Sequence, residues 1–132
     1  MMDAADRLIA ERACERLIID YAALVDAAHW DAVAALYSAG GRMSRPTAPD
    51  DFIEGRDAIL KSFLARPPRT TRHICANIRV TLDSAAHATA QSQILLFTGV
   101  DQPPLVGSYA DIIADEGDGW CFIERRGSLD FV

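Results

Sequence analysis

The chain has 132 residues, a formal net charge of −6, 50% apolar residues and 24% charged residues. This length and composition fit one folded domain with its own core and lie far from the composition of disordered proteins. The acidic balance repels a phosphate backbone, and no apolar run approaches the ~18 residues of a membrane span, so we expect neither nucleic acid nor a membrane as a partner. The three cysteines form no Cys-x-x-Cys pair, which indicates reduced thiols, a cytoplasmic protein and no structural zinc.

The first part of the chain shows helical periodicity. Apolar residues recur at helical spacing over residues 4–27, and Asp3 can cap the start of this long helix. A shorter helix is predicted over residues 31–37, and Gly40 and Gly41 follow it as stop signals. We therefore expect two consecutive helices at the beginning of the domain.

The rest of the sequence predicts one more helix and a set of strands. Residues 41–54 contain two prolines among polar residues, a pattern typical of an irregular strand pair or loop. A third helix follows Gly55 and ends at Pro67 and Pro68. From there the periodicity changes to two, and turn signals separate the apolar runs. The predicted long strands cover residues 70–83, 87–98, 105–115 and 120–131.

Helices followed by strands in a meander predict an α+β domain that spans residues 1–132. In this fold class a cone-shaped, curved antiparallel sheet packs one face on the N-terminal helices. A bent sheet with a helix across it encloses a pocket, which is where small molecules bind. We therefore expect a small-molecule ligand, and association into a homodimer or homotrimer through the exposed face of the sheet.

His73 and Asp26 are the first candidates for chemistry. An imidazole can transfer a proton near pH 7, and a buried carboxylate can orient it and stabilise its charged form. Alternation along the strand places His73 and Asn77 on one face, which is the more polar one. That face can line a cavity or be bare surface. Asp26 also has two local candidate partners, His29 and Trp30, so the sequence leaves its partner open.

Arg125 and two tyrosines are further candidates. Arg125 can hold an anionic or carbonyl oxygen with its fork of donors, or it can form a salt bridge with a neighbouring acid such as Asp111. Tyr21 and Tyr109 can present hydroxyl groups to a ligand, whereas Tyr37 is expected only to pack.

Arg66, Arg69 and Arg72 form the densest basic stretch, on either side of Pro67 and Pro68. Three arginines can hold an anion, but we interpret them as a solvated loop. The chain contains no phosphate loop, no Gly-x-Ser-x-Gly and no His-Glu-x-x-His. We therefore expect no cofactor and no metal.

Several short motifs, taken in order, resemble the nuclear transport factor 2-like superfamily, and within it the SnoaL-like group. The resemblance implies a cone-shaped barrel with a deep pocket. It also points to two enzyme branches, scytalone dehydratase and hexachlorocyclohexane dehydrochlorinase, which both use an aspartate–histidine pair. The motifs are Tyr-Ala-Ala-Leu-Val-Asp-Ala-Ala-His-Trp-Asp at 21–31, Leu36-Tyr37, Gly-Arg-Asp-Ala-Ile at 55–59, His73 with Asn77, Ser-Tyr-Ala-Asp at 108–111, and Gly-Trp at 119–120 with Arg125.

Carried over to this chain, the resemblance assigns the pair to Asp26 and His73 and an accompanying arginine to Arg125. Tyr21 stands where the dehydrochlorinase has a pocket lysine, and residues 91–94 lack the second histidine of scytalone dehydratase. The substrate therefore differs from both. The predicted function is a cofactor-independent lyase or isomerase that acts on a small, mostly apolar cyclic or carbonyl compound. Its catalytic residues are Asp26, His73 and Arg125, and its substrate contacts are Tyr21, Trp30, Asn77 and Tyr109.

A non-catalytic module is the alternative. The segment Gly-Trp-Cys-Phe-Ile-Glu-Arg-Arg-Gly-Ser-Leu-Asp at 119–130 resembles the end of the small β subunit of ring-hydroxylating dioxygenases. That subunit supports a larger partner and carries no chemistry. A closed cavity with His73 and Asp26 in contact indicates an enzyme, and a cavity filled by side chains indicates a support subunit.

Overall fold

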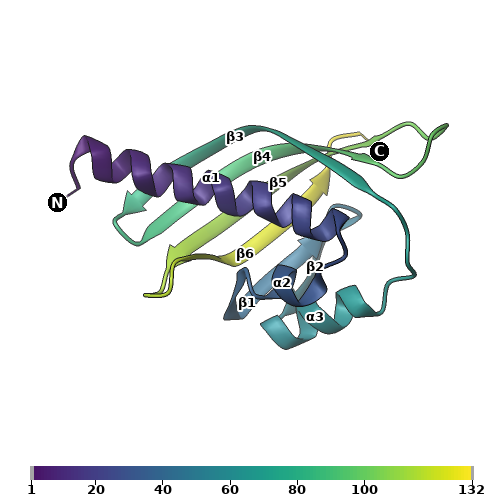
Figure 1. Ribbon diagram of the computed structural model, residues 1–132, viewed down its shortest axis with the longest axis horizontal. Helices are drawn as coiled ribbons and strands as arrows, with labels where there is room; N and C mark the ends of the chain where they lie inside the picture. Colours follow the sequence, from purple (N-terminus) through teal and green to yellow (C-terminus); the bar gives the residue numbers. More distant parts are fainter. Residues whose placement is uncertain (1, 132) are drawn as a thin grey trace.

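The computed structural model describes residues 2–131, which form a curved sheet with helices on one face (Figure 1). The long first helix crosses the sheet, and the two shorter helices lie beside its first two strands. The helices are α1 (Ala4–Asp26), α2 (Trp30–Ala34) and α3 (Arg56–Leu64). The strands are β1 (Tyr37–Arg45), β2 (Ala48–Glu54), β3 (Arg72–Ser84), β4 (His87–Phe97), β5 (Leu105–Asp115) and β6 (Trp120–Leu129).

The six strands have the order β2-β1-β6-β5-β4-β3, so the sheet is open, with β2 and β3 at its edges. The predicted α+β class and the four-stranded meander are confirmed. The predicted antiparallel pairing holds for the meander and for β1 with β2, and the sheet is mixed because β1 lies parallel to β6. After β2 the chain passes through α3 to the far edge of the sheet, where β3 begins. The meander β3 to β6 then runs back across the sheet, so that the last strand, β6, lies beside the first strand, β1.

Helix α1 forms as the periodicity predicts. Asp3 and Asp6 form a capping box, in which the Asp6 backbone N–H donates to Asp3 Oδ1 at 2.8 Å. The buried residues recur every three or four positions, so one stripe of the helix packs on the inner face of the sheet. Those residues are Ala10, Cys14, Leu17, Ile18, Tyr21, Ala22 and Val25.

Strand β1 replaces the end of the predicted second helix. Helix α2 ends at Ala34, and Tyr37 already pairs with Phe122 of β6. Gly40 and Gly41 are therefore strand residues, and the prediction that they stop a helix is wrong. A Cβ on Gly41 would lie 2.9 Å from the Phe122 carbonyl oxygen, so glycine is needed here for close strand approach.

A β-bulge in β3 changes which residues face the helices. The pairing with β4 shifts between Ala76 and Arg79, and Asn77 adopts a φ of 52°, a conformation that asparagine tolerates better than most residues. Before the bulge His73 faces inward, and after it Ile78 packs on the core. Asn77 lies in the bulge itself and is exposed, so simple alternation from His73 does not extend through it.

Apolar side chains are exposed on the outer face of the sheet, among them Ile74, Leu95 and Phe97. Such a patch is a feature of self-associating proteins, and the dimer or trimer stays a prediction. Within residues 2–131, no helix is long and apolar enough to cross a membrane.

We predict that Gly127→Ala destabilises the fold. Gly127 lies in β6 against the turn between β1 and β2, and a Cβ there would lie 2.6 Å from the backbone nitrogen of Pro46. Overpacking of this kind costs about 1–3 kcal/mol of unfolding free energy, measured by urea titration. Gly40→Ala is the control, because a Cβ on Gly40 meets no atom within 4 Å. Equal midpoints for the two variants would show that β6 can move away from Pro46.

Candidate active site

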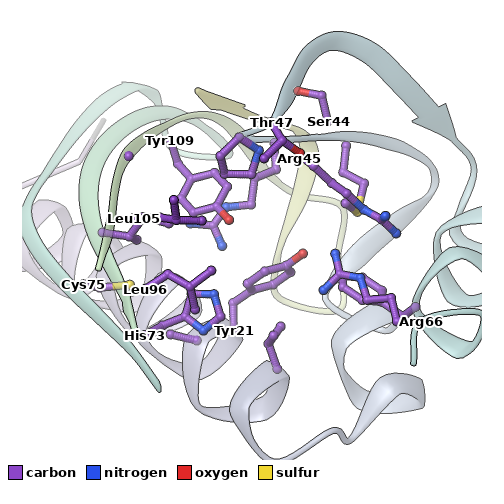
Figure 2. Close-up of a pocket in the computed structure, with 18 of the residues that line it drawn as sticks. Tyr21, Ser44, Arg45, Thr47, Arg66, His73, Cys75, Leu96, Leu105 and Tyr109 are labelled. Atoms are coloured by element: carbon purple, nitrogen blue, oxygen red, sulfur yellow. The ribbon is translucent and has the colours of Figure 1, made fainter. Parts of the chain in front are cut away.

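A cavity of about 450 Å³ lies between α1 and the inner face of the sheet. Its wall includes residues of α1, β1 and β3 to β6, and of the end of α3 with the segment that follows it. Figure 2 shows His73, Tyr21, Tyr109 and Arg66 around the same open space. The wall is mostly apolar with a few polar groups, which is the usual character of a small-molecule site.

Asp26 and His73 are in contact at one side of this cavity. The ring Nδ1 of His73 lies 2.6 Å from Asp26 Oδ1. The backbone N–H of His73 donates to Oδ2 at 2.8 Å, and the Thr71 hydroxyl donates to Oδ1 at 2.9 Å. The two paired side chains are only 11–12% exposed, and these donors replace the water that the carboxylate loses on burial. Because Nδ1 is occupied, Nε2 is the nitrogen that His73 can offer to a ligand.

The end of α1 explains the position of the carboxylate. Asp26 is the last residue of α1, and Ala28 adopts a left-handed φ of 56° that turns the chain into α2. An acid at a helix C-terminus is unfavourable for the helix dipole by about 0.3–1 kcal/mol. The hydrogen bonds from β3 offset that cost. The local candidate partners do not take this place, because His29 is exposed and Trp30 stacks on Phe63.

Arg125 is both a salt-bridge partner and a part of the cavity wall. It is 1% exposed, and its Nε donates to Asp111 Oδ1 at 3.1 Å on the neighbouring strand. Its guanidinium carbon lies 3.8 Å from the centre of the Tyr109 ring and 4.4 Å from that of Tyr21, which adds cation–π stabilisation. Among residues 2–131, its Nη2 atom has no hydrogen-bond partner.

The ion pair stays charged at neutral pH. Burial acts to lower the pKa of Arg125, but the Asp111 carboxylate and the nearby tyrosines raise it above its ordinary value. Burial raises the pKa of the Asp111 carboxyl to about 6, and the attraction of Arg125 opposes this rise. The fixed positive charge at the base of the cavity therefore comes with a counter-ion.

Three tyrosines line the cavity near Arg125. The hydroxyls of Tyr21 and Tyr37 lie 2.9 Å apart. Burial raises the pKa of both and of Tyr109, so all three keep their protons. A neutral phenol can donate to a ligand oxygen. Tyr37, which we expected only to pack, is thus part of the polar wall.

The other predicted substrate contacts, Trp30 and Asn77, are not in the cavity wall. Trp30 stacks on Phe63 with ring centres 5.0 Å apart, so it lies behind a residue of the wall. Asn77 lies in the bulge of the edge strand β3 and is exposed. In the described part of the chain, no group of three or more His, Cys, Asp or Glu residues can hold a metal ion.

One side of the cavity is basic, and it includes Arg45, which was not among the predicted site residues. Arg45 and Arg66 line it, and Arg66 is half-buried with its guanidinium carbon 4.5 Å from the centre of the Phe63 ring. The predicted solvated loop is therefore wrong for Arg66. The two prolines that follow it were the available signal, because they end α3 and turn the chain along the cavity mouth.

Solved structures with this fold cover nearly the whole chain. A scytalone dehydratase-like protein from Novosphingobium aromaticivorans is 27% identical, with a TM-score of 0.84 over 98% of this chain and 89% of that chain. The hexachlorocyclohexane dehydrochlorinase LinA-type3 from Novosphingobium barchaimii is 17% identical, with a TM-score of 0.84 over 98% and 92%. An aromatic ring hydroxylase-like protein from Novosphingobium aromaticivorans is 17% identical, with a TM-score of 0.82 over 95% and 92%.

No curated protein matches the chain in sequence. The SnoaL-like domain, however, matches residues 6–126, which is almost the whole chain. This match agrees with the order of elements, the curved sheet and the cavity described above. The chain belongs to the SnoaL-like domain family.

Proposed function

We propose that the protein is a cofactor-independent lyase or isomerase that acts on a small, mostly apolar cyclic or carbonyl compound. The observation that supports this proposal is the 2.6 Å contact between His73 Nδ1 and Asp26 Oδ1 in the wall of the cavity. The similarity to a scytalone dehydratase-like protein at 27% identity agrees with it. The proposed reaction is therefore acid/base catalysis by protein side chains, without a cofactor.

In this mechanism His73 is the general base. Its Nε2 accepts a proton from a carbon next to a carbonyl group or a leaving group, while Asp26 holds the Nδ1–H and stabilises the imidazolium that forms. The imidazolium then returns the proton to a second carbon, which completes an isomerisation, or gives it to a departing hydroxyl group, which completes a dehydration. Both routes begin with the same proton transfer.

The developing negative charge on the substrate needs donors on the opposite side. Within the Tyr21–Tyr37 pair one hydroxyl donates to the other, which leaves the second proton free for a ligand oxygen. Arg125 adds a fixed positive charge close to Tyr21 and Tyr109. Donors that are already in place inside an apolar wall stabilise an oxyanion more than water does.

The cavity is not filled by side chains, which favours an enzyme over a non-catalytic subunit. A subunit without chemistry has no need for an empty space of about 450 Å³, because filling it with side chains stabilises a core by removing the cavity cost. It also has no need for a carboxylate held on a histidine ring. The substrate is expected to differ from those of both enzyme branches, because Tyr21 replaces the pocket lysine of one and Gln91–Ile94 lacks the second histidine of the other.

His73→Gln is expected to abolish proton transfer. Wild-type protein in D2O should isomerise cyclohex-3-enone or dehydrate 3-hydroxycyclohexanone with deuterium entering the ring, followed by proton NMR. The variant should be roughly 100-fold slower or more, which is the usual contribution of a general base. His87→Gln is the matched control, because His87 lies on the exposed hairpin beside Asp83. Equal rates for the two variants would remove His73 from the mechanism.

The ring tautomer of His73 gives a test that needs no substrate. We expect the neutral ring to carry its proton on Nδ1, because Asp26 accepts it there. In Asp26→Asn the amide N–H faces the ring instead and favours the Nε2–H tautomer, which blocks the base. Long-range proton–nitrogen NMR correlations at mildly alkaline pH distinguish the two. The ring signals of His87 should stay the same in both proteins, and an unchanged His73 tautomer would contradict the role of Asp26.

Arg125 can be tested apart from its structural role. Arg125→Met leaves the buried Asp111 without its counter-ion and should destabilise the fold by about 3–5 kcal/mol in urea titration. The double variant Arg125→Met/Asp111→Leu should recover most of that stability, since apolar residues replace the pair. Turnover of the double variant should still be roughly 100-fold lower, because the oxyanion loses a donor. Full turnover in this stable variant would restrict Arg125 to a structural role.

A further inference from the structure

The cavity wall is basic although the chain as a whole is acidic. The net charge of the chain is −6, yet the residues that line the cavity include four arginines and no aspartate or glutamate. The arginines are Arg45, Arg66, Arg69 and Arg125. A neutral apolar ligand gives no reason for this arrangement, because each buried or half-buried cation costs desolvation energy. The wall therefore matches a ligand that carries negative charge.

Of the four arginines in the cavity wall, Arg125 alone is paired with a carboxylate within residues 2–131. Arg125 pairs with Asp111 at 3.1 Å. Arg66 is half-buried, and among residues 2–131 no carboxylate lies within salt-bridge distance of it. Burial lowers its pKa, and the positive charge of Arg45 and of Arg69 lowers it further. An anion placed beside Arg66 would relieve the burial cost and this repulsion together.

Arg45 and Arg69 extend the basic wall on either side of Arg66. Arg45 donates to the Ser62 carbonyl oxygen at 3.2 Å, while its Nε atom is buried without a partner in the described part of the chain. Arg69 is exposed and still belongs to the cavity wall. The charge therefore continues from the interior to the surface, an arrangement that attracts anions from solution.

We propose that Arg66 binds the carboxylate of the substrate, so that the ligand of this cavity is a small organic acid with an apolar ring. Arg45 and Arg66 are both half-buried, and among residues 2–131 neither has a carboxylate partner. Arg45 already donates to the Ser62 carbonyl oxygen, so the guanidinium of Arg66 is the better match for a monoanion, and the planar fork of arginine fits a carboxylate in a bidentate manner. The inference names the substrate class of the proposed acid/base site and rests on that proposal for the position of the ring.

The arrangement of the cavity wall suits such a ligand (Figure 2). Arg66 points into the cavity on one side of Tyr21, and His73 lies on the other side. A carboxylate on Arg66 therefore directs the ring across Tyr21 toward the imidazole. Apolar residues such as Leu96 and Leu105 border this path. Binding energy from the charged end thus holds the reacting carbon near the base.

The experiment compares two probes of the same shape, 2-naphthoate and 2-naphthamide, by isothermal titration calorimetry or NMR titration. Wild-type protein should bind the acid roughly 10–100-fold more tightly than the amide, which is the usual effect of a charge-assisted pair. Arg66→Gln should remove this preference and leave binding of the amide unchanged. Arg72→Gln is the matched control, because it removes the same charge from an exposed residue outside the cavity wall.

The outcomes separate the two proposals. The preference for the acid over the amide is a ratio of two affinities that is measured without turnover, so a failure of catalysis leaves this test intact. Equal affinity for acid and amide, binding of neither, or an unchanged preference in Arg66→Gln would overturn the inference. Tighter binding of 2-naphthyl phosphate than of 2-naphthoate would also overturn it, in favour of a phosphate-bearing ligand.

Discussion

The carboxylate of Asp26 joins the two parts of the structure between which the cavity lies. Helix α1 ends at this residue, and the groups that bind it lie at the start of β3: the Thr71 hydroxyl just before the strand, and the backbone and ring of His73 within it. A buried carboxylate is tolerated only where donors replace its water. The same contacts that make Asp26 acceptable in the interior therefore fix the distance between helix and sheet at this edge, and they set the orientation of the imidazole.

The second polar element of the interior is organised differently. Arg125 lies between aromatic rings and is held by Asp111 from the neighbouring strand. Such pairs contribute little net stability, because desolvation cancels most of the attraction. What the pair of Arg125 and Asp111 provides is a positive charge that is held in one position and shielded from water. A cavity with a rigid charge at its base, phenol hydroxyls beside it and a base at its side needs little rearrangement during a reaction.

Local patterns predicted the helices α1 and α3 and the meander of β3 to β6, because each depends on periodicity within a short stretch. They failed at β1, where Gly40 and Gly41 look like a helix stop. Those residues are in a strand because of contacts with β6, about 80 positions later in the chain, as the pairing of Arg42 with Glu124 shows. The local pattern of a single sequence contains no signal for such a contact.

The candidate site shows the same division. The pairing of Asp26 with His73 came from the family resemblance, since periodicity alone left His29 and Trp30 as alternatives. Asn77 is outside the cavity wall because it lies in the bulge, whereas the alternation that grouped it with His73 assumes an unbroken ladder. Arg66 was assigned to solvent because basic loops usually are. Whether a loop covers a cavity depends on the three-dimensional path of the chain.

The bulge also divides β3 into two segments with separate tasks. The segment with His73 and Cys75 faces the ligand space, and the segment with Ile78, Val80 and Leu82 packs under α1. Because the extra residue absorbs the change of register, a substitution in the first segment need not disturb the packing of the second. In a domain with this β-bulge, substitutions near His73 can therefore change the substrate preference while the hydrophobic core under α1 stays the same.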